Sequence, residues 1–172
     1  MNYKKKLNHI NTFIFDIDGV LTDGTVTLFG NGEQVRKMCT RDGYAMQYAI
    51  KKGYKIAIIS GGSSEGVKQR FDLLGITDVY LSYSNKMEAF NDLVEKYDLN
   101  SDYILYMGDD LPDWEVMQKV GLPTCPHDAA NEIKETAEYV SPIIGGSGCV
   151  RDVIEQTLRV QGKWGDKEEL GW

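Results

Sequence analysis

The sequence predicts an α/β fold in which a central parallel sheet lies between two layers of helices. Short apolar segments alternate with helical patterns along the 172 residues, and strands buried on both faces typically read as such apolar runs. The polar residues Asp16, Ser60 and Asp109 each end or follow one of these runs. Parallel strands bring their carboxyl ends to one edge, where ligands bind, so we expect a Rossmann-like three-layer sandwich with its site at that edge.

The expected elements follow one another in a single domain that spans residues 1–172. Buried strands are predicted at Thr12–Asp16, Lys55–Ser60, Val79–Leu81, Tyr103–Met107 and Leu122–Cys125. The turn Gly30-Asn31-Gly32 joins Thr25–Phe29 to Glu33–Met38, which predicts a small β-hairpin insertion over residues 25–38. Helices are predicted at Asp42–Lys51, Ser63–Leu74 (capped by Ser63 or Ser64 and stopped by Gly75), Asn85–Tyr97, Pro112–Val120, Ala129–Thr136 and Gly148–Val160.

Composition narrows the function classes. The net charge is −7 and the sequence pI is about 4.9. The one run of basic residues is Lys4-Lys5-Lys6, which we interpret as a solvated end of the chain. We therefore expect no nucleic-acid partner. We also expect no membrane association, because no apolar run approaches a bilayer-spanning length. Three cysteines without paired spacing predict free thiols and a cytoplasmic protein.

The strongest chemical signal is Asp16-Ile17-Asp18-Gly19, where an apolar strand ends in two carboxylates two residues apart. Such close carboxylates repel each other and need a cation or a proton. The Asp-x-Asp-Gly pattern also begins some calcium-binding loops. The calcium interpretation is disfavoured because Val20 cannot supply the next ligand and no helix precedes the loop.

Two further positions fit a phosphate. Ser60 ends a strand before Gly61 and Gly62, where its hydroxyl and the following helix N-terminus could bind phosphate oxygens. Lys86 begins a helix, where it opposes the helix dipole, and its ammonium could stabilise charge on a transferring phosphoryl group. Taken alone, each has an ordinary explanation, as a turn before a capped helix and as a surface lysine.

The apolar strand predicted at Tyr103–Met107 runs directly into Gly108-Asp109-Asp110, with Asp113 shortly after. Adjacent carboxylates at a buried strand end suit Mg²⁺, which prefers oxygen ligands. The alternative is an acidic helix start, in which Asp110 or Asp113 caps the helix near Pro112; that alternative suits Asp113 better than Asp109.

Together these motifs resemble the haloacid dehalogenase superfamily of phosphatases, over roughly Phe13 to Asp113. Within it, the chain is similar to the 3-deoxy-D-manno-octulosonate 8-phosphate (KDO-8-phosphate) phosphatase family over nearly its whole length. The residues that carry this similarity are Asp16 to Gly24, Arg41 to Tyr44, Arg70 with Leu74-Gly75-Ile76, Lys86, and Gly145 to Gly148 with Arg151.

The resemblance implies a haloacid dehalogenase fold and a Mg²⁺-dependent phosphatase that forms an aspartyl-phosphate on Asp16. Asp18 would act as acid and then base, and Ser60 and Lys86 would hold the phosphoryl group. Asp16, the Asp18 carbonyl and Asp109 would bind the metal. The implied substrate-binding residues are Thr40, Arg41, Asp42, Gly43, Gly61, Gly62, Arg70 and Lys86.

One departure concerns Gly62, because the resembling family often has arginine there, so this contact is missing or supplied elsewhere. Arg70 is our candidate for the sugar carboxylate. The alternatives are a phosphatase for a related sugar acid, such as a nine-carbon 2-keto-3-deoxy acid 9-phosphate, and an inactive phosphatase fold used as a binding module. The binding-module alternative would be favoured if Asp16 or Asp18 were missing, but both residues are present.

The spacing of the motifs leaves no room for a cap domain. Only a hairpin and a helix separate Asp16 from Ser60, and one helix and one short strand separate Ser60 from Lys86. An open site would be screened by water, so we expect a neighbouring chain to close it in a homotetramer, as the resembling family implies. The C-terminal segment 145–172 would reach that site through Gly145–Gly148; alternatively, these glycines are only a flexible link to the last helix.

Overall fold

The structure, a computed structural model, describes residues 2–165 and confirms the predicted parallel sheet. Six strands lie in the order β5-β4-β1-β6-β7-β8, and every neighbouring pair is parallel. Their bounds are β1 Thr12–Phe15, β4 Lys55–Ile59, β5 Asp78–Tyr80, β6 Ile104–Met107, β7 Leu122–Cys125 and β8 Tyr139–Val140. The chain passes from β1 to β4 on one side and later to β6 on the other, so the topological switch point lies at β1.

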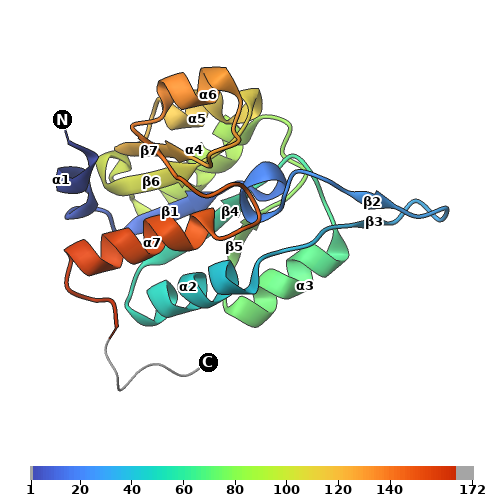
Figure 1. Cartoon of the computed structure of the whole chain (residues 1–172), viewed down its shortest axis with the longest axis horizontal. Helices are drawn as coiled ribbons and strands as arrows, with labels where there is room; N and C mark the ends of the chain where they lie inside the picture. The colour runs from blue at the N-terminus through green and yellow to red at the C-terminus, as the bar shows by residue number, and fades with distance from the viewer. Residues whose placement is uncertain (1, 166–172) are drawn as a thin grey trace.

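Helices cover both faces of the sheet (Figure 1). One face carries α1 Tyr3–Leu7, α2 Thr40–Lys51, α3 Glu65–Leu74 and α7 Cys149–Val160, and the other carries α4 Lys86–Tyr97, α5 Trp114–Met117 and α6 Asn131–Thr136. Alternate residues of β1 explain the two cores, because Phe13 and Phe15 join the first cluster while Ile14 joins the second. No helix of the described chain is long and apolar enough to cross a membrane.

Several element boundaries differ from the prediction. The helix expected over Pro112–Val120 is a 3₁₀ turn, Leu111–Asp113, followed by the short α5, which ends early because the chain turns into β7 at Gly121. There, an added Cβ would lie 1.9 Å from the Asp102 carbonyl oxygen. Ser64 does occupy the N-cap of α3, but its side chain makes no capping hydrogen bond, whereas Gly75 ends the helix in the left-handed region as predicted.

The structure contains a helix, α1, and a strand, β8, that were not predicted from the sequence. The lysines interpreted as a solvated end belong to α1, whose Leu7 is buried, and Lys6 pairs with Glu138. The other element is β8, which is only two residues long. Helix α1 packs on one face of the sheet and β8 adds an edge strand, and neither contributes a residue to the acidic cluster.

The predicted hairpin is present, but its paired strands are short, with β2 covering Thr27–Leu28 and β3 covering Gln34–Val35. It extends away from the body of the protein (Figure 1). Its apolar side chains are exposed: Leu28 is 70% exposed and Phe29 is 52% exposed. The expected absence of a cap domain is confirmed, since this hairpin is the one insertion between β1 and α2.

The segment that follows Gly145 packs into the domain, which corrects the flexible-link interpretation and, for residues 145–165, the interpretation of an arm that reaches a neighbouring site. A Cβ on Gly145 would lie 2.0 Å from the Gly19 carbonyl oxygen, so these glycines pack tightly on the loop after β1 and do not form a flexible link. Helix α7 then buries Val150, Ile154 and Leu158 in the first core. A separate C-terminal arm is therefore excluded for residues 145–165, and residues 166–172 lie outside the described chain.

Candidate active site

The loop after β1 brings Asp16 and Asp18 to the carboxyl edge of the sheet. Asp16 follows the last residue of β1 and is 5% exposed. Gly19 adopts a φ of +93°, and a Cβ at this position would lie 2.0 Å from Asp109 Oδ2. Glycine is required here for both reasons, because it allows the left-handed backbone and the close approach of the Asp109 carboxylate.

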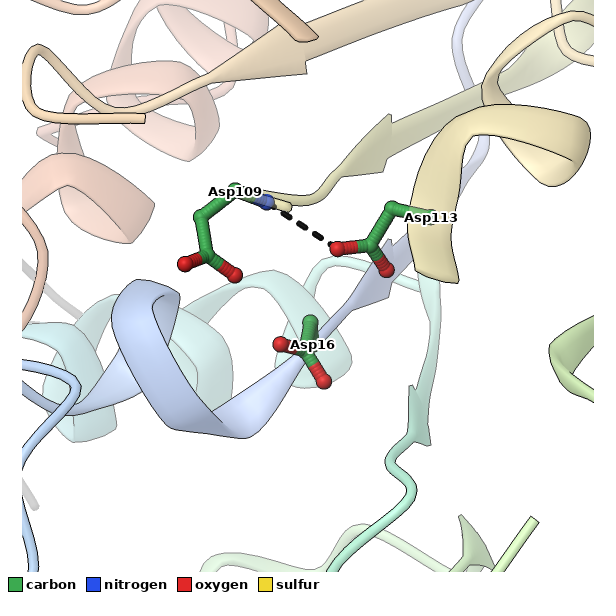
Figure 2. Close-up of side chains that lie close together, drawn as sticks. All are labelled: Asp16, Asp109 and Asp113. Atoms are coloured by element: carbon green, nitrogen blue, oxygen red, sulfur yellow. Dashed lines mark hydrogen bonds between the residues drawn. The ribbon is translucent and has the colours of Figure 1, made fainter. Parts of the chain in front are cut away.

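Three carboxylates gather at this edge, as Figure 2 shows for Asp16, Asp109 and Asp113. One oxygen from each lies within 4.8 Å of the others. Asp16 and Asp109 come from the ends of β1 and β6, which the parallel register places side by side. The sequence prediction that these two acids meet is confirmed, and Asp113 is an addition to the cluster.

Lys86 lies between two of these carboxylates. Its Nζ is 2.8 Å from Asp16 Oδ1 and 2.6 Å from Asp113 Oδ1, and the side chain is 5% exposed. Burial lowers the pKa of Lys86, but the charges of Asp16 and Asp113 outweigh burial and raise it overall. Lys86 is therefore held as a buried ammonium beside Asp16, and the surface-lysine interpretation is wrong.

Asp113 organises the cluster through both of its oxygens. Oδ1 accepts from Lys86 and from the Tyr106 hydroxyl, while Oδ2 accepts from the backbone N–H groups of Asp109 and Asp110. Asp110 caps the 3₁₀ turn, in a capping box with Asp113. The alternative of a capping role thus holds for both residues, and Asp113 also orients Lys86.

The charge of the cluster is only partly compensated. Burial, and then the charge of Asp113, raises the pKa of Asp16 to about 7, although Lys86 acts in the opposite direction. Burial, and then the charges of Asp16 and Asp113, raises the pKa of Asp109 to about 8. Carboxylates held this close in a buried site need either a proton or a cation.

The cluster fits Mg²⁺. The donors are hard oxygens, as this cation prefers, and Gly19 leaves the space that lets Asp109 approach the loop after β1. Asp113 already uses both oxygens for protein donors, so Asp16 and Asp109 are the carboxylates free to bind a metal, with the Asp18 backbone carbonyl as the predicted third ligand.

We expect the apparent affinity for Mg²⁺ to rise with pH between about 6 and 8. Protons occupy Asp16 and Asp109 below their raised pKa values, and binding must displace them, at about tenfold in affinity per pH unit per proton. Calorimetric titration at several pH values measures this, and comparing two buffers counts the released protons. An affinity that is constant over this range would contradict the protonation state inferred for the cluster.

Ser60 lies in the same cleft as the acidic cluster. It is 2% exposed, and its hydroxyl accepts a hydrogen bond from the Gly62 N–H at 3.2 Å. The cleft has a volume of about 420 Å³. Its lining brings together these sequence-predicted residues: Asp16, Asp18, Ser60, Gly61, Gly62, Lys86 and Asp109.

The other candidate substrate residues lie outside this cleft in a single chain. Thr40 begins α2, where Arg41 donates to the Ser147 carbonyl. Asp42 is 1% exposed and accepts from the Arg151 N–H at 2.7 Å, so within this chain it connects α2 to the start of α7. Gly43 packs against Arg70, because a Cβ at Gly43 would meet Arg70 Nη2 at 2.6 Å.

Arg36 is the site residue that sequence reasoning missed. It follows β3 in the hairpin and makes two contacts to Asp18, from Nε to Oδ1 at 2.6 Å and from Nη2 to Oδ2 at 3.0 Å. Arg36 also lines, together with Arg70, a neighbouring cleft of about 310 Å³ between the hairpin and α3. The alternation of the hairpin does not indicate which of its side chains turns back to the loop after β1.

The comparisons with known proteins agree with this geometry. Residues 75–148 match the family model of haloacid dehalogenase-like hydrolases. The chain is 42% identical over 158 residues to the 3-deoxy-D-manno-octulosonate 8-phosphate phosphatase of Escherichia coli K12, covering 92% of this chain and 84% of that protein.

Solved structures show the same similarity. The crystal structure of the phosphatase of that name from Yersinia pestis superposes with a TM-score of 0.91 at 35% identity, covering 93% of this chain and 86% of that one. The Moraxella catarrhalis phosphatase, solved in complex with a magnesium ion, a phosphate ion and a KDO molecule, superposes with a TM-score of 0.91 at 30% identity, covering 95% of each chain.

Proposed function

We propose that this chain, which belongs to the 3-deoxy-D-manno-octulosonate 8-phosphate phosphatase family of haloacid dehalogenase-like hydrolases, hydrolyses KDO-8-phosphate to KDO and phosphate. The observation that carries the proposal is the pairing of buried Asp16 with Lys86 beside Asp109, at the switch point of a parallel sheet. The implied role in lipopolysaccharide precursor synthesis follows from that substrate.

The residues divide the reaction into two displacements. Asp16 attacks phosphorus while the bond to the sugar oxygen breaks, and Asp18 gives that oxygen its proton. Water then attacks the same phosphorus, Asp18 takes its proton, and the bond between phosphorus and Asp16 breaks. Lys86 and the Ser60 hydroxyl hold the phosphoryl oxygens, since both face the cleft beside Asp16.

Mg²⁺ is the cofactor, and when bound by Asp16, Asp109 and the Asp18 carbonyl it offsets the charge of the carboxylates and the phosphoryl group. Lys86 supplies the protein's own positive charge at this point, held in place by Asp113. Without Lys86, two buried carboxylates would face each other, so this lysine both stabilises the cluster and contacts the transferring group.

The sugar acid requires a second cationic position. Arg70 is our candidate for its carboxylate, because Arg70 and Arg36 line the neighbouring cleft between the hairpin and α3. Arg41, Asp42 and Gly43 are proposed to serve a substrate bound with the help of an adjacent chain. Gly61 and Gly62 line the cleft that holds Asp16 and Ser60.

We predict that KDO-8-phosphate has the highest specificity constant in a panel of sugar phosphates. The matched comparison is a nine-carbon 2-keto-3-deoxy acid 9-phosphate, which carries the same carboxylate on a longer chain. Arg70→Ala should raise the KM for both sugar acids by about tenfold and leave p-nitrophenyl phosphate unaffected, because that compound has no carboxylate. A higher specificity constant for the nine-carbon substrate would establish the alternative substrate.

We also propose that four chains assemble and that a neighbour closes each active site. The support is the extended hairpin with its exposed apolar side chains at Val26, Leu28, Phe29 and Val35, which a monomer would leave in water. Light scattering should give four times the chain mass. Leu28→Ser with Phe29→Ser should yield smaller species of lower activity, and Leu73→Ser, at an exposed α3 position, is the matched control.

Since α7 belongs to the core, a chain that ends before Gly145 cannot test this assembly. A chain that ends at Gly165 can test this assembly, because it retains the described core and lacks only the last seven residues of the 172. A fully active monomer would contradict the proposal that neighbours complete the site. The free thiols Cys39, Cys125 and Cys149 support a reducing, cytoplasmic setting for the reaction.

A further inference from the structure

Arg36 and Asp18 form a two-point contact between the hairpin and the loop after β1. The two contacts, at 2.6 and 3.0 Å, use both carboxylate oxygens, which is the paired geometry that arginine and carboxylate favour. The Arg36 side chain is 6% exposed, although most of the hairpin around it is exposed. This arginine thus turns inward from an otherwise solvated segment.

Gly62 makes room for this contact. A Cβ on Gly62 would lie 3.1 Å from Asp18 Oδ2 and 3.2 Å from Arg36 Nη2, closer than side chains normally approach. The backbone gives no other reason for glycine, since Gly62 is not among the residues of positive φ. Arg36 and Asp18 therefore occupy the space that a side chain at position 62 would need.

The contact fixes the side chain to which the proposed reaction assigns proton transfer. Asp18 is 37% exposed at the mouth of the cleft, and in residues 2–165 its carboxylate has no hydrogen-bond donor apart from Arg36. Without that donor the carboxylate would be free to rotate between solvent and the cleft. Correct placement of a catalytic group contributes strongly to rate, so its loss should affect turnover rather than binding.

We propose that Arg36 is a positioning residue: from the hairpin it holds the ionised Asp18 carboxylate at the mouth of the cleft, ready to act as the base of the second displacement, and Gly62 leaves the space for this pairing. The inference rests on the proposed function, in which Asp18 transfers the proton. It also couples the hairpin to catalysis, because a displacement of β2 and β3 moves Arg36 and with it Asp18.

A double-mutant cycle tests the proposal, using the full chain with Mg²⁺ and KDO-8-phosphate. Arg36→Met, which retains side-chain bulk, should lower kcat roughly tenfold with KM changed less than about twofold. Asp18→Asn should lower kcat further, and adding Arg36→Met to it should cause no additional loss. Arg36→Lys should retain more activity than Arg36→Met, because lysine keeps the positive charge but cannot make the paired contact to both carboxylate oxygens. Thr27→Ala, at an exposed position on β2 of the same hairpin, is the control, and thermal unfolding checks that each variant is folded.

Independent, multiplicative losses in the double variant would overturn the proposal, as would a loss carried by KM, which would make Arg36 a substrate ligand. Unchanged kcat in Arg36→Met would overturn it as well. If the unsubstituted protein cleaves p-nitrophenyl phosphate but not KDO-8-phosphate, the proposed substrate fails, while the same cycle read with the aryl phosphate still decides the role of Arg36.

Discussion

Asp16→Asn should lose turnover by at least about three orders of magnitude while the protein stays folded. A carboxamide is a far poorer nucleophile than a carboxylate, and Asp16 is the residue to which the proposed mechanism assigns the attack on phosphorus. Folding should not suffer, because the substitution removes one of several buried, mutually repelling carboxylates and leaves Lys86 paired with Asp113. Steady-state kinetics and thermal unfolding measure the two effects.

Asp72→Asn is the matched control for that variant, since Asp72 is exposed on α3, away from the cleft. Its turnover should equal that of the unsubstituted protein. Near-normal turnover in Asp16→Asn would exclude a covalent intermediate at this residue. Loss of folding in Asp16→Asn would contradict the charge balance described for the cluster.

The second large effect separates Asp109 from Asp113. Asp109→Ala should abolish measurable Mg²⁺ affinity and turnover with little change in unfolding temperature, because the Asp109 carboxylate lies in the metal cluster. Asp113→Ala should instead destabilise the fold, because Lys86, Tyr106 and two backbone N–H groups lose their acceptor. Calorimetry with Mg²⁺ and thermal unfolding distinguish the two variants.

The reverse ranking, with Asp113→Ala losing more metal affinity than Asp109→Ala, would exchange the roles assigned to these two acids. Asp110→Ala is the control on the same turn, since it removes only a cap of the 3₁₀ turn. We expect this control to cost about 1 kcal/mol of stability and to leave metal binding unchanged.

The convergence of Asp16, Ser60 and Asp109 could be predicted from the sequence because it follows from topology. Each residue ends or follows an apolar strand, and parallel strands present their carboxyl ends at one edge. Lys86 was predicted on other grounds, from its ammonium at a helix start and from the family resemblance, and it begins α4, the helix that follows β5. The local sequence pattern was sufficient to predict a site residue where that residue lies at or directly after the end of a strand.

The partners of those residues could not be predicted, since they depend on packing between distant segments. Asp113 was expected only as a cap, but the short 3₁₀ turn directs its carboxylate to Lys86, 27 residues earlier in the chain. Arg36 belongs to a hairpin whose alternation gives no sign of its contact with Asp18. For Arg36, the available signal was the combination of an arginine in the hairpin with a glycine at position 62.

The most direct test of the central claim is to trap phosphate on Asp16. In Asp18→Asn, p-nitrophenyl phosphate has a good leaving group that needs no proton, whereas hydrolysis of the covalent intermediate lacks its base, so the phosphorylated protein should accumulate. Quenching in acid and peptide mapping by mass spectrometry should find one phosphate per chain, on the peptide that contains Asp16. The addition of Asp16→Asn should remove the phosphate. Label on Ser60, or equal label in the double variant, would contradict the aspartyl-phosphate mechanism.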